Sequence, residues 1–261
     1  MIFLSFDIEE FDNPLPYSKP LNFEQQMSIS KIGTDRILDL LLQEKVKATF
    51  FCTANFALHA TGLIDRMVNE GHEVASHGYY HATFEQKDLG ESKKVLEQIT
   101  GTTIIGFRMP NMAPLEALPV IEAGYKYNSS LNPTFLPGKY NNLNKPRRIF
   151  YENGLCQIPA SVSALFRIPL FWLSLHNFPI NIYKRMCQRA ILKDGYLNIY
   201  FHPWEFADLL SPEVKLPYYI VRNSGDVLVE RLRSLIHYFS RKNHQFGTLK
   251  ECLTLYPDKS V

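Results

Sequence analysis

Residues 1–10 read MIFLSFDIEE, an apolar run that ends in a cluster of carboxylates. The apolar part predicts a buried strand, and Asp7, Glu9 and Glu10 stand at its end. Carboxylates this close repel one another, so the cluster needs a neighbouring cation, shared protons or exposure to water. Which of the three applies depends on what the rest of the chain brings to this strand end.

Helix-like segments alternate with short strand-like runs in the first half of the chain. Within residues 30–46, apolar side chains recur at helical spacing: Ile32, Ile37, Leu38, Leu41 and Leu42. The strand-like run KATFF follows, and the same order returns at 63–78, 89–110 and 114–130, where each helix closes at a glycine. This alternation predicts a parallel sheet with helices outside, either an open doubly wound sheet or a closed barrel.

The longest apolar stretch is IPASVSALFRIPLFWLSL, residues 158–175. It carries Arg167 and two interior prolines and is barely long enough to cross a bilayer, so we do not expect a transmembrane helix. A buried strand and helix in the core is the favoured interpretation. The alternative is an apolar rim that contacts a membrane or a lipid-linked substrate. Further on, residues 195–205 predict another strand and residues 226–243 an amphipathic helix.

Composition narrows the class of protein. Lys and Arg number 28 against 26 Asp and Glu, so no strong positive field exists to attract nucleic acid. The four cysteines are far apart with no CxxC pair, which argues against a disulfide framework or a cysteine-rich zinc site. The first residues lack the pattern of a secretory signal, and we expect a cytoplasmic protein. A length of 261 residues is compatible with one domain, and we expect a single catalytic domain over residues 1–261.

Polar clusters close four of the expected strands. Besides the acidic cluster, they are His77 and His81 in SHGYYH, Arg108 in FRMPN, and His202 with Glu205 in FHPWEF. The carboxyl ends of parallel strands face one side of the sheet, so these clusters should meet. Two histidines and a carboxylate are a ligand set for a zinc-like ion with one position open to water. A cation would also relieve the repulsion within the acidic cluster.

The ordered motifs SFDIEE, SHGYYH, GFRMPN and YFHPWE resemble those of the polysaccharide deacetylases of carbohydrate esterase family 4, in particular an exopolysaccharide-associated branch. The resemblance covers residues 2–206 and implies a distorted (β/α) barrel that hydrolyses a sugar N-acetyl group with a divalent metal, most commonly Zn²⁺. It implies that Asp7 is the catalytic base and that Arg108 orients it. It also implies that His202 is the general acid and that His77 and His81 bind the metal.

The first motif departs from the family pattern, in which two adjacent aspartates are usual and the second binds metal. Ile8 occupies that second place and cannot be a ligand. Alternation along a strand sends Asp7 and Glu9 to the same side. We therefore assign the role of metal-binding carboxylate to Glu9, with Glu10 as the weaker alternative. Asn128 stands where many relatives have Asp. Glu205 is then the nearest candidate for the residue that adjusts the pKa of His202.

The expected substrate is an N-acetylated glycan or a lipid-linked glycan precursor. We expect Tyr79, Trp204 and Pro110 to contact it, and the aromatic faces of Tyr79 and Trp204 suit sugar rings and acetyl methyl groups. Two other functions compete with this interpretation. If Ile8 signals loss of the metal, the barrel is a catalytically inactive glycan-binding module; a metal-free hydrolase of small cyclic amides is the third candidate. Metal content separates them.

Overall fold

A nine-stranded sheet forms the centre of the computed structural model, which describes residues 1–12, 21–209, 214 and 216–258. The order in the sheet is β10-β1-β2-β3-β4-β5-β9-β8, and β11 also pairs with β1. All pairs are parallel except β8 with β9. The strands are β1 (Ile2–Ile8), β2 (Thr49–Cys52), β3 (Glu73–Ser76), β4 (Gly106–Phe107), β5 (Tyr127–Asn128), β8 (Phe150–Glu152), β9 (Leu155–Gln157), β10 (Leu197–Phe201) and β11 (Phe246–Gly247).

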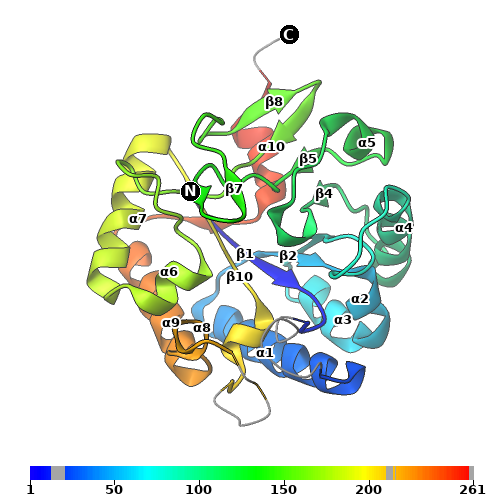
Figure 1. Cartoon of the computed structure of the whole chain (residues 1–261), viewed down its shortest axis with the longest axis horizontal. Coiled ribbons are helices and arrows are strands. Elements are labelled where there is room, and N and C mark those ends of the chain that lie inside the picture. Colours follow the sequence, from blue (N-terminus) through cyan, green and yellow to red (C-terminus); the bar gives the residue numbers. More distant parts are fainter. Residues whose placement is uncertain (13–20, 210–213, 215, 259–261) are drawn as a thin grey trace.

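Helices surround the strands on the outside, as Figure 1 shows. The longer ones are α1 (Phe23–Glu44), α3 (Thr61–Asn69), α4 (Asp88–Thr100), α7 (Ile180–Asp194) and α9 (Asp226–Ser240). Shorter ones are α2 (Ala54–His59), α5 (Ala117–Glu122), α6 (Trp172–Asn177), α8 (Tyr218–Val221) and α10 (Cys252–Leu255), with single 3₁₀ turns at η1 (Pro110–Met112), η2 (Pro203–Phe206) and η3 (Leu249–Glu251). α4 and α7 end at Gly101 and Gly195, which take the left-handed conformation expected of helix-closing glycines.

The expected distorted (β/α) barrel is confirmed, and it closes at a seam between β10 and the chain that follows β9. The backbone N–H of Ser161 donates to the carbonyl of Asn198 at 2.8 Å, and the N–H of Asn198 donates back to the Ser161 hydroxyl at 2.8 Å. The Asn198 side chain donates to the Pro159 carbonyl at 3.2 Å. Side chains therefore supply part of the closure that a strand ladder would otherwise provide.

Strand β1 is buried on both faces, and its residues alternate as expected. Ile2, Leu4, Phe6 and Ile8 join the apolar layer between sheet and helices, whereas Asp7 and Glu9 line a cavity on the other side. The polar side chains thus emerge where the strand ends, and the apolar ones hold it in the core. Neighbouring β2 contributes Phe50, which stacks on Phe6 with ring centres 5.3 Å apart.

The helix expected within residues 30–46 is present as part of α1, and one expectation about the later apolar segment is wrong. The buried face of α1 runs through Met27, Ile37, Leu38 and Leu41, whereas Ile32 and Leu42 are exposed. Residues 158–175 form no buried strand: apart from one bridge between Val162 and Pro169 they are irregular until α6 begins at Trp172. The two prolines prevent a continuous ladder here.

Within that segment, residues 164–167 form a turn that we call the apolar turn. Leu165 and Phe166 are 74% and 80% exposed, the opposite of the expected core position. Side chains from elsewhere hold the turn: Arg147 donates to the carbonyls of residues 162–164, and Lys193 donates to the Ala164 carbonyl at 2.7 Å. Arg147 is itself paired with Asp194 at 2.6 Å. Two apolar side chains are thus presented to solvent on a supported backbone.

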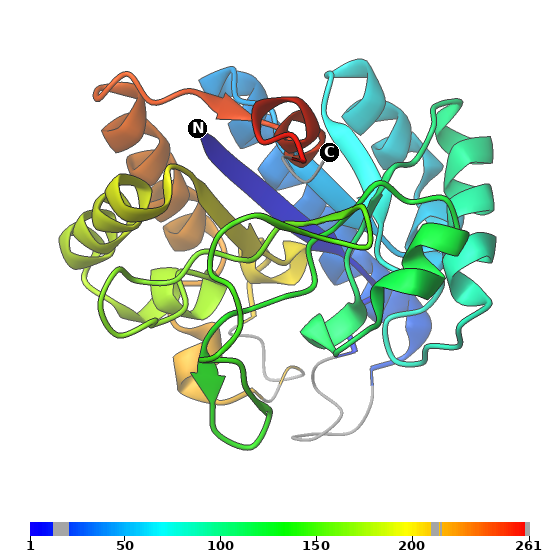
Figure 2. The ribbon, with the colours of Figure 1, turned by 90° about the horizontal axis from the view of Figure 1, so that it is seen from above.

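Among the described residues, no helix has both the length and the apolar character needed to cross a membrane. The small hairpin β6 (Phe135–Leu136) and β7 (Tyr140–Asn141) lies at the end of the barrel where β1 ends, at the bottom of Figure 2. Leu136 and Tyr140 from this hairpin line the same cavity as Asp7 and Glu9. The hairpin therefore forms part of the cavity wall.

Candidate active site

A cavity of about 270 Å³ lies at the carboxyl ends of β1, β3 and β10. It brings together polar residues from motifs that are far apart in the chain, from Asp7 in the first motif to His202 in the last. Its lining comprises Asp7, Glu9, His77, His81, Asn111, Met112, Leu136, Pro137, Lys139, Tyr140, Phe171, Trp172, Leu173, Tyr200, His202 and Trp204. The expected convergence of strand-end clusters therefore occurs.

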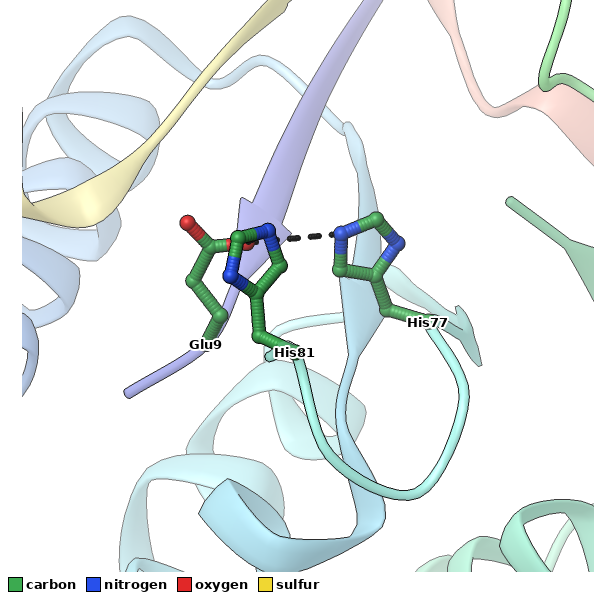
Figure 3. A group of neighbouring side chains, drawn as sticks. All are labelled: Glu9, His77 and His81. Atoms are coloured by element: carbon green, nitrogen blue, oxygen red, sulfur yellow. Dashed lines mark ion pairs between the residues drawn. The ribbon is translucent and has the colours of Figure 1, made fainter. Parts of the chain in front are cut away.

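Glu9, His77 and His81 converge on one point, as Figure 3 shows. Oε2 of Glu9 lies 3.0 Å from Nε2 of His81 and 3.4 Å from Nε2 of His77. All three side chains are buried, and one ligand atom from each lies within 4.8 Å of the others. Glu9 comes from the end of β1, and both histidines follow β3. These are the three residues that the sequence predicts as metal ligands.

The outward nitrogens of both histidines are already in use. Nδ1 of His77 donates to the Arg108 carbonyl at 2.8 Å, and Nδ1 of His81 donates to the Asp12 carboxylate at 2.9 Å. With a proton on Nδ1, a neutral imidazole turns the lone pair of Nε2 toward Glu9. Oε2 of Glu9, buried, has no hydrogen-bond partner. Three acceptor atoms thus face one another, an arrangement that fits a divalent cation with tetrahedral nitrogen and oxygen ligands.

The electrostatics of the cluster point the same way. Burial alone would raise the pKa of Glu9, but His81 and His77 outweigh it and lower the pKa to about 2. Burial alone would lower the pKa of His81, but Glu9 and Asp12 outweigh it and raise the pKa to about 9. The pocket therefore stabilises positive charge next to the Glu9 carboxylate, and a divalent cation would supply that charge without protons.

Asp7 lies beside this cluster and is held by Arg108. Nη1 of Arg108 donates to Oδ1 of Asp7 at 2.6 Å, and both side chains are buried. The guanidinium also donates to the carbonyl and hydroxyl of Ser129, at 3.1 and 3.0 Å, and lies 4.1 Å from the centre of the Phe51 ring. With its rotamer fixed on several sides, Arg108 orients one oxygen of Asp7 and leaves the other as an available base.

On the opposite side of the cavity, His202 is held by Glu205 in the turn η2. Oε1 of Glu205 accepts from Nδ1 of His202 at 2.8 Å and from its backbone N–H at 2.6 Å. Burial lowers the pKa of His202, but the hydrogen bond to Glu205 and the charge of Glu9 raise it above its usual value. His202 therefore remains protonated to a higher pH than a free imidazole, as a general acid requires.

The cavity wall is aromatic but differs from the expected one. Trp204 lines it and stacks on His202 with ring centres 5.2 Å apart. Tyr79 and Pro110 are not among the lining residues: the Tyr79 ring packs against Tyr80, and the Pro110 ring packs over Gly78. Tyr140, Phe171, Trp172 and Tyr200 complete the wall.

Sequence reasoning missed Asp12 and His176, which support the site from outside. Asp12 fixes His81, and Nε2 of His176 lies 3.1 Å from Oε2 of Glu205. Asp12 stands three residues after Glu9 in the acidic first motif, a signal that was available. His176 directly follows the apolar segment 158–175, and no local pattern connects it to Glu205. Asn111 and Met112, both with positive φ, also line the cavity.

Comparisons with known proteins show what this chain is similar to. The family model "Polysaccharide deacetylase" matches residues 20–127, which include both histidines and Arg108. The barrel also superposes on the crystal structure of a probable polysaccharide deacetylase from Pseudomonas aeruginosa PAO1, with a TM-score of 0.66 and 16% identity, covering 99% of this chain and 92% of the other. The family model covers less than half of this chain, so the chain resembles polysaccharide deacetylases over part of its sequence and shares their fold.

Curated members of the polysaccharide deacetylase family match shorter segments. A chitooligosaccharide deacetylase from Bradyrhizobium sp. (strain ANU 289) is 31% identical over 113 residues, 43% of this chain and 42% of that protein. A peptidoglycan-N-acetylglucosamine deacetylase from Bacillus cereus is 36% identical over 81 residues, 31% of this chain and 28% of that protein. The chain thus aligns with less than half the length of these relatives.

The departure from the first motif of the polysaccharide deacetylases has a structural reason. Ile8 faces the apolar layer between sheet and helices, so a carboxylate there would point away from the cavity. Glu10 is also unavailable, because its Oε2 accepts from the Thr53 hydroxyl at 2.9 Å and its Oε1 from the His81 backbone N–H at 3.4 Å. Glu9 alone of the three neighbours reaches the two histidines.

Proposed function

We propose that the protein is a metal-dependent deacetylase that removes an N-acetyl group from a sugar of a bacterial polysaccharide or of its precursor. One observation carries the proposal. Glu9, His77 and His81 form a cation-binding cluster in the same cavity as the Asp7–Arg108 pair and the His202–Glu205 pair. The match to the family model over residues 20–127 and the names of the curated relatives support the substrate class.

An amide hydrolase needs an activated water, a stabilised oxyanion and a proton for the leaving amine. A divalent cation held by Glu9, His77 and His81, for which we propose Zn²⁺, would supply Lewis acidity toward both the water and the acyl carbonyl. Asp7 takes the proton from the attacking water through the carboxylate oxygen that is not bound to Arg108. His202 donates the proton of Nε2 to the amine nitrogen, because its Nδ1 proton is engaged by Glu205.

The aromatic wall gives the cavity its selectivity for a sugar. Trp204 is buried and immobilised between His202 and Phe11, with ring centres 5.2 and 5.3 Å apart. Tyr140, Phe171 and Trp172 add apolar faces around the cavity, and Asn111 and Lys139 add polar groups at its edge. Because both faces of Trp204 are covered, the faces of the other three rings are the ones that would pack against a pyranose ring or an acetyl methyl group, while polar groups would bind sugar hydroxyls.

The experiment measures acetate release from a panel of N-acetylated glycans, with protein stripped of metal and with protein reloaded with zinc. We expect release only from the reloaded protein. Glycan binding without acetate release and without bound metal would support an inactive glycan-binding barrel instead. Hydrolysis of small cyclic amides by stripped protein would support the metal-free alternative, and either result would overturn the proposal.

We further propose that the protein acts in the cytoplasm on a precursor, including one linked to a lipid. Cys52, Cys156, Cys187 and Cys252 are free and buried, which suits a reducing compartment. The apolar turn, residues 164–167, precedes the cavity-lining residues 171–173 in the chain and offers a contact for a membrane or a lipid-linked substrate. Cell fractionation tests the location: recovery of the protein from an extracytoplasmic fraction with its cysteines disulfide-linked would contradict it.

A further inference from the structure

Glu205 is buried between two histidines, and only one of them lines the cavity. Its Oε1 accepts from Nδ1 of His202 at 2.8 Å, and its Oε2 lies 3.1 Å from Nε2 of His176. The side chains of Glu205 and His176 are both fully buried. His176 belongs to α6, whereas His202 directly precedes the turn η2 and Glu205 lies within it. A buried carboxylate with histidines on both sides must therefore share its protons with them.

The position of one proton follows from the partners of His176. Its Nδ1 lies 2.8 Å from the carbonyl oxygen of Arg222, which can only accept, so Nδ1 carries a proton. If Nε2 and Oε2 were both bare, two lone pairs would face each other at 3.1 Å in a site closed to water. A second proton therefore lies between Nε2 and Oε2, and the His176–Glu205 pair is neutral as a whole whichever atom holds it.

We propose that His176 is a positioning residue of this site: it neutralises Glu205 and thereby holds His202 with Nδ1 protonated and Nε2 available to the leaving group. The proposal rests on the deacetylase function proposed above. A bare carboxylate at 2.8 Å would bind the His202 imidazolium strongly and make it a poor acid. A neutralised carboxylate still fixes the ring but lets the proton leave.

Few groups near His202 influence how readily it releases its proton. The titratable groups that influence it are Glu205 from its own turn, Asp7 and Glu9 from β1, and, through Glu205, His176 from α6. Tyr200 from β10 faces it at 6.0 Å between ring centres, and the rings of Trp172 and Trp204 cover it without titrating. Among these groups, His176 alone acts on the far oxygen of Glu205.

The test is a double-mutant cycle on the zinc-loaded protein, read as the pH dependence of acetate release. His176→Phe leaves Glu205 charged, which makes His202 hold its proton more tightly. The alkaline limb of the pH–rate profile, where His202 loses this proton, should therefore move up by about 1 pH unit, within the range that a nearby opposite charge produces. In the Glu205→Gln background the same His176→Phe change should move it by less than about 0.3 unit, because no carboxylate charge is released. Equal shifts in both backgrounds, or none, would overturn the proposal.

A second variant separates charge from packing. Gln at position 176 can donate a hydrogen bond to Glu205 but cannot carry its proton, so His176→Gln should recover thermal stability relative to His176→Phe while keeping the alkaline shift. If His176→Gln restores the wild-type pH profile, the role of His176 is structural only. His237→Phe is the matched control, since it removes a histidine that pairs with Glu44 at 2.8 Å on the outside of the barrel.

Nuclear magnetic resonance of ¹³Cε1-labelled histidine gives a readout that needs no turnover. The titration of His202, assigned by comparison with His202→Gln, should shift upward in His176→Phe by the same amount as the kinetic limb. If no glycan releases acetate but this shift occurs, the proposed function fails and the role of His176 stands. If acetate is released and the His202 titration is the same in both proteins, the role of His176 is wrong.

Discussion

The guanidinium of Arg108 lies 2.6 Å from the carboxylate of Asp7, although 101 positions separate the two residues in the chain. β1 supplies the acid and the loop after β4 supplies the cation, and the barrel brings both to one strand end. Glu9, two residues further on, turns to His77 and His81 instead. Two carboxylates on the same side of one strand therefore have different partners and different expected roles.

This difference predicts opposite phenotypes for two isosteric variants. Asp7→Asn should keep metal affinity near that of the wild type but lose about 10²- to 10⁴-fold in rate, because an amide cannot accept the proton of water. Glu9→Gln should weaken metal binding by about 10- to 100-fold or more, and added zinc should partly restore its rate. Bound metal and acetate release decide the matter. An Asp7→Asn protein without metal, beside a fully active Glu9→Gln protein, would reverse the assignment.

Restoring the usual family motif should damage this protein. Ile8→Asp would place a carboxylate in the apolar layer between sheet and helices, and we expect a loss of unfolding free energy on the order of 3 kcal/mol or more. Ile8→Val is the control and should cost about 1 kcal/mol. Urea unfolding measures both. If Ile8→Asp is as stable as the wild type and rescues metal binding in Glu9→Gln, the orientation of residue 8 described above is wrong.

His72 predicts a loss of stability in acid that is independent of the active site. Burial and the charge of Lys47 lower its pKa to about 4, and its Nδ1 accepts from the Ala48 N–H at 3.2 Å. The unfolded chain binds this proton below about pH 6.5, so the stability from the neutral ring is present above pH 6.5 and is lost as pH falls toward 4. Between pH 6.5 and pH 4, the free energy of unfolding measured with urea should fall less for His72→Asn than for the wild type, by roughly 1–3 kcal/mol. Identical pH slopes would contradict the prediction.

The apolar turn predicts a measurable affinity for membranes. Phe166 and Leu165 would be buried on contact with a bilayer, and Arg148, which lies 3.5 Å from Asp194 but is 62% exposed, would add a positive charge for anionic lipid. The double substitution Leu165→Ser with Phe166→Ser should weaken cosedimentation with anionic vesicles by at least about tenfold. Leu118→Ser, an exposed leucine on α5, is the control. Failure of the wild type to bind such vesicles would rule out the membrane contact.

The parts of the site that could be predicted from sequence depend on local alternation. Period-two alternation places Asp7 and Glu9 on one face and Ile8 on the other, and the strand ends gather His77, His81, Arg108 and His202. These rules need only the neighbours along the strand and the direction of parallel strands.

The parts that could not be predicted depend on tertiary contacts. The expected core strand in residues 158–175 failed because cations from residues 147 and 193 satisfy the carbonyls of residues 162–164 in place of a neighbouring strand. His176 was missed because its partners, Glu205 and the Arg222 carbonyl, lie 29 and 46 positions away. Tyr79 was assigned to the wall because its motif is adjacent to His77, but the loop turns its ring elsewhere.

The cavity has two walls that are built from different parts of the chain and meet at the seam between β10 and the chain after β9. The ends of β1, β3 and β10 carry the expected ligands, base and acid, whereas the hairpin β6–β7 and the segment that leads into α6 carry Leu136, Tyr140, Phe171 and Trp172 on the facing wall. Because Ser161 and Asn198 join the two walls through only a few hydrogen bonds, insertions in the facing wall need not disturb the strands. Under the proposed function, evolution could therefore change the glycan that is accepted while the residues proposed for hydrolysis keep their places.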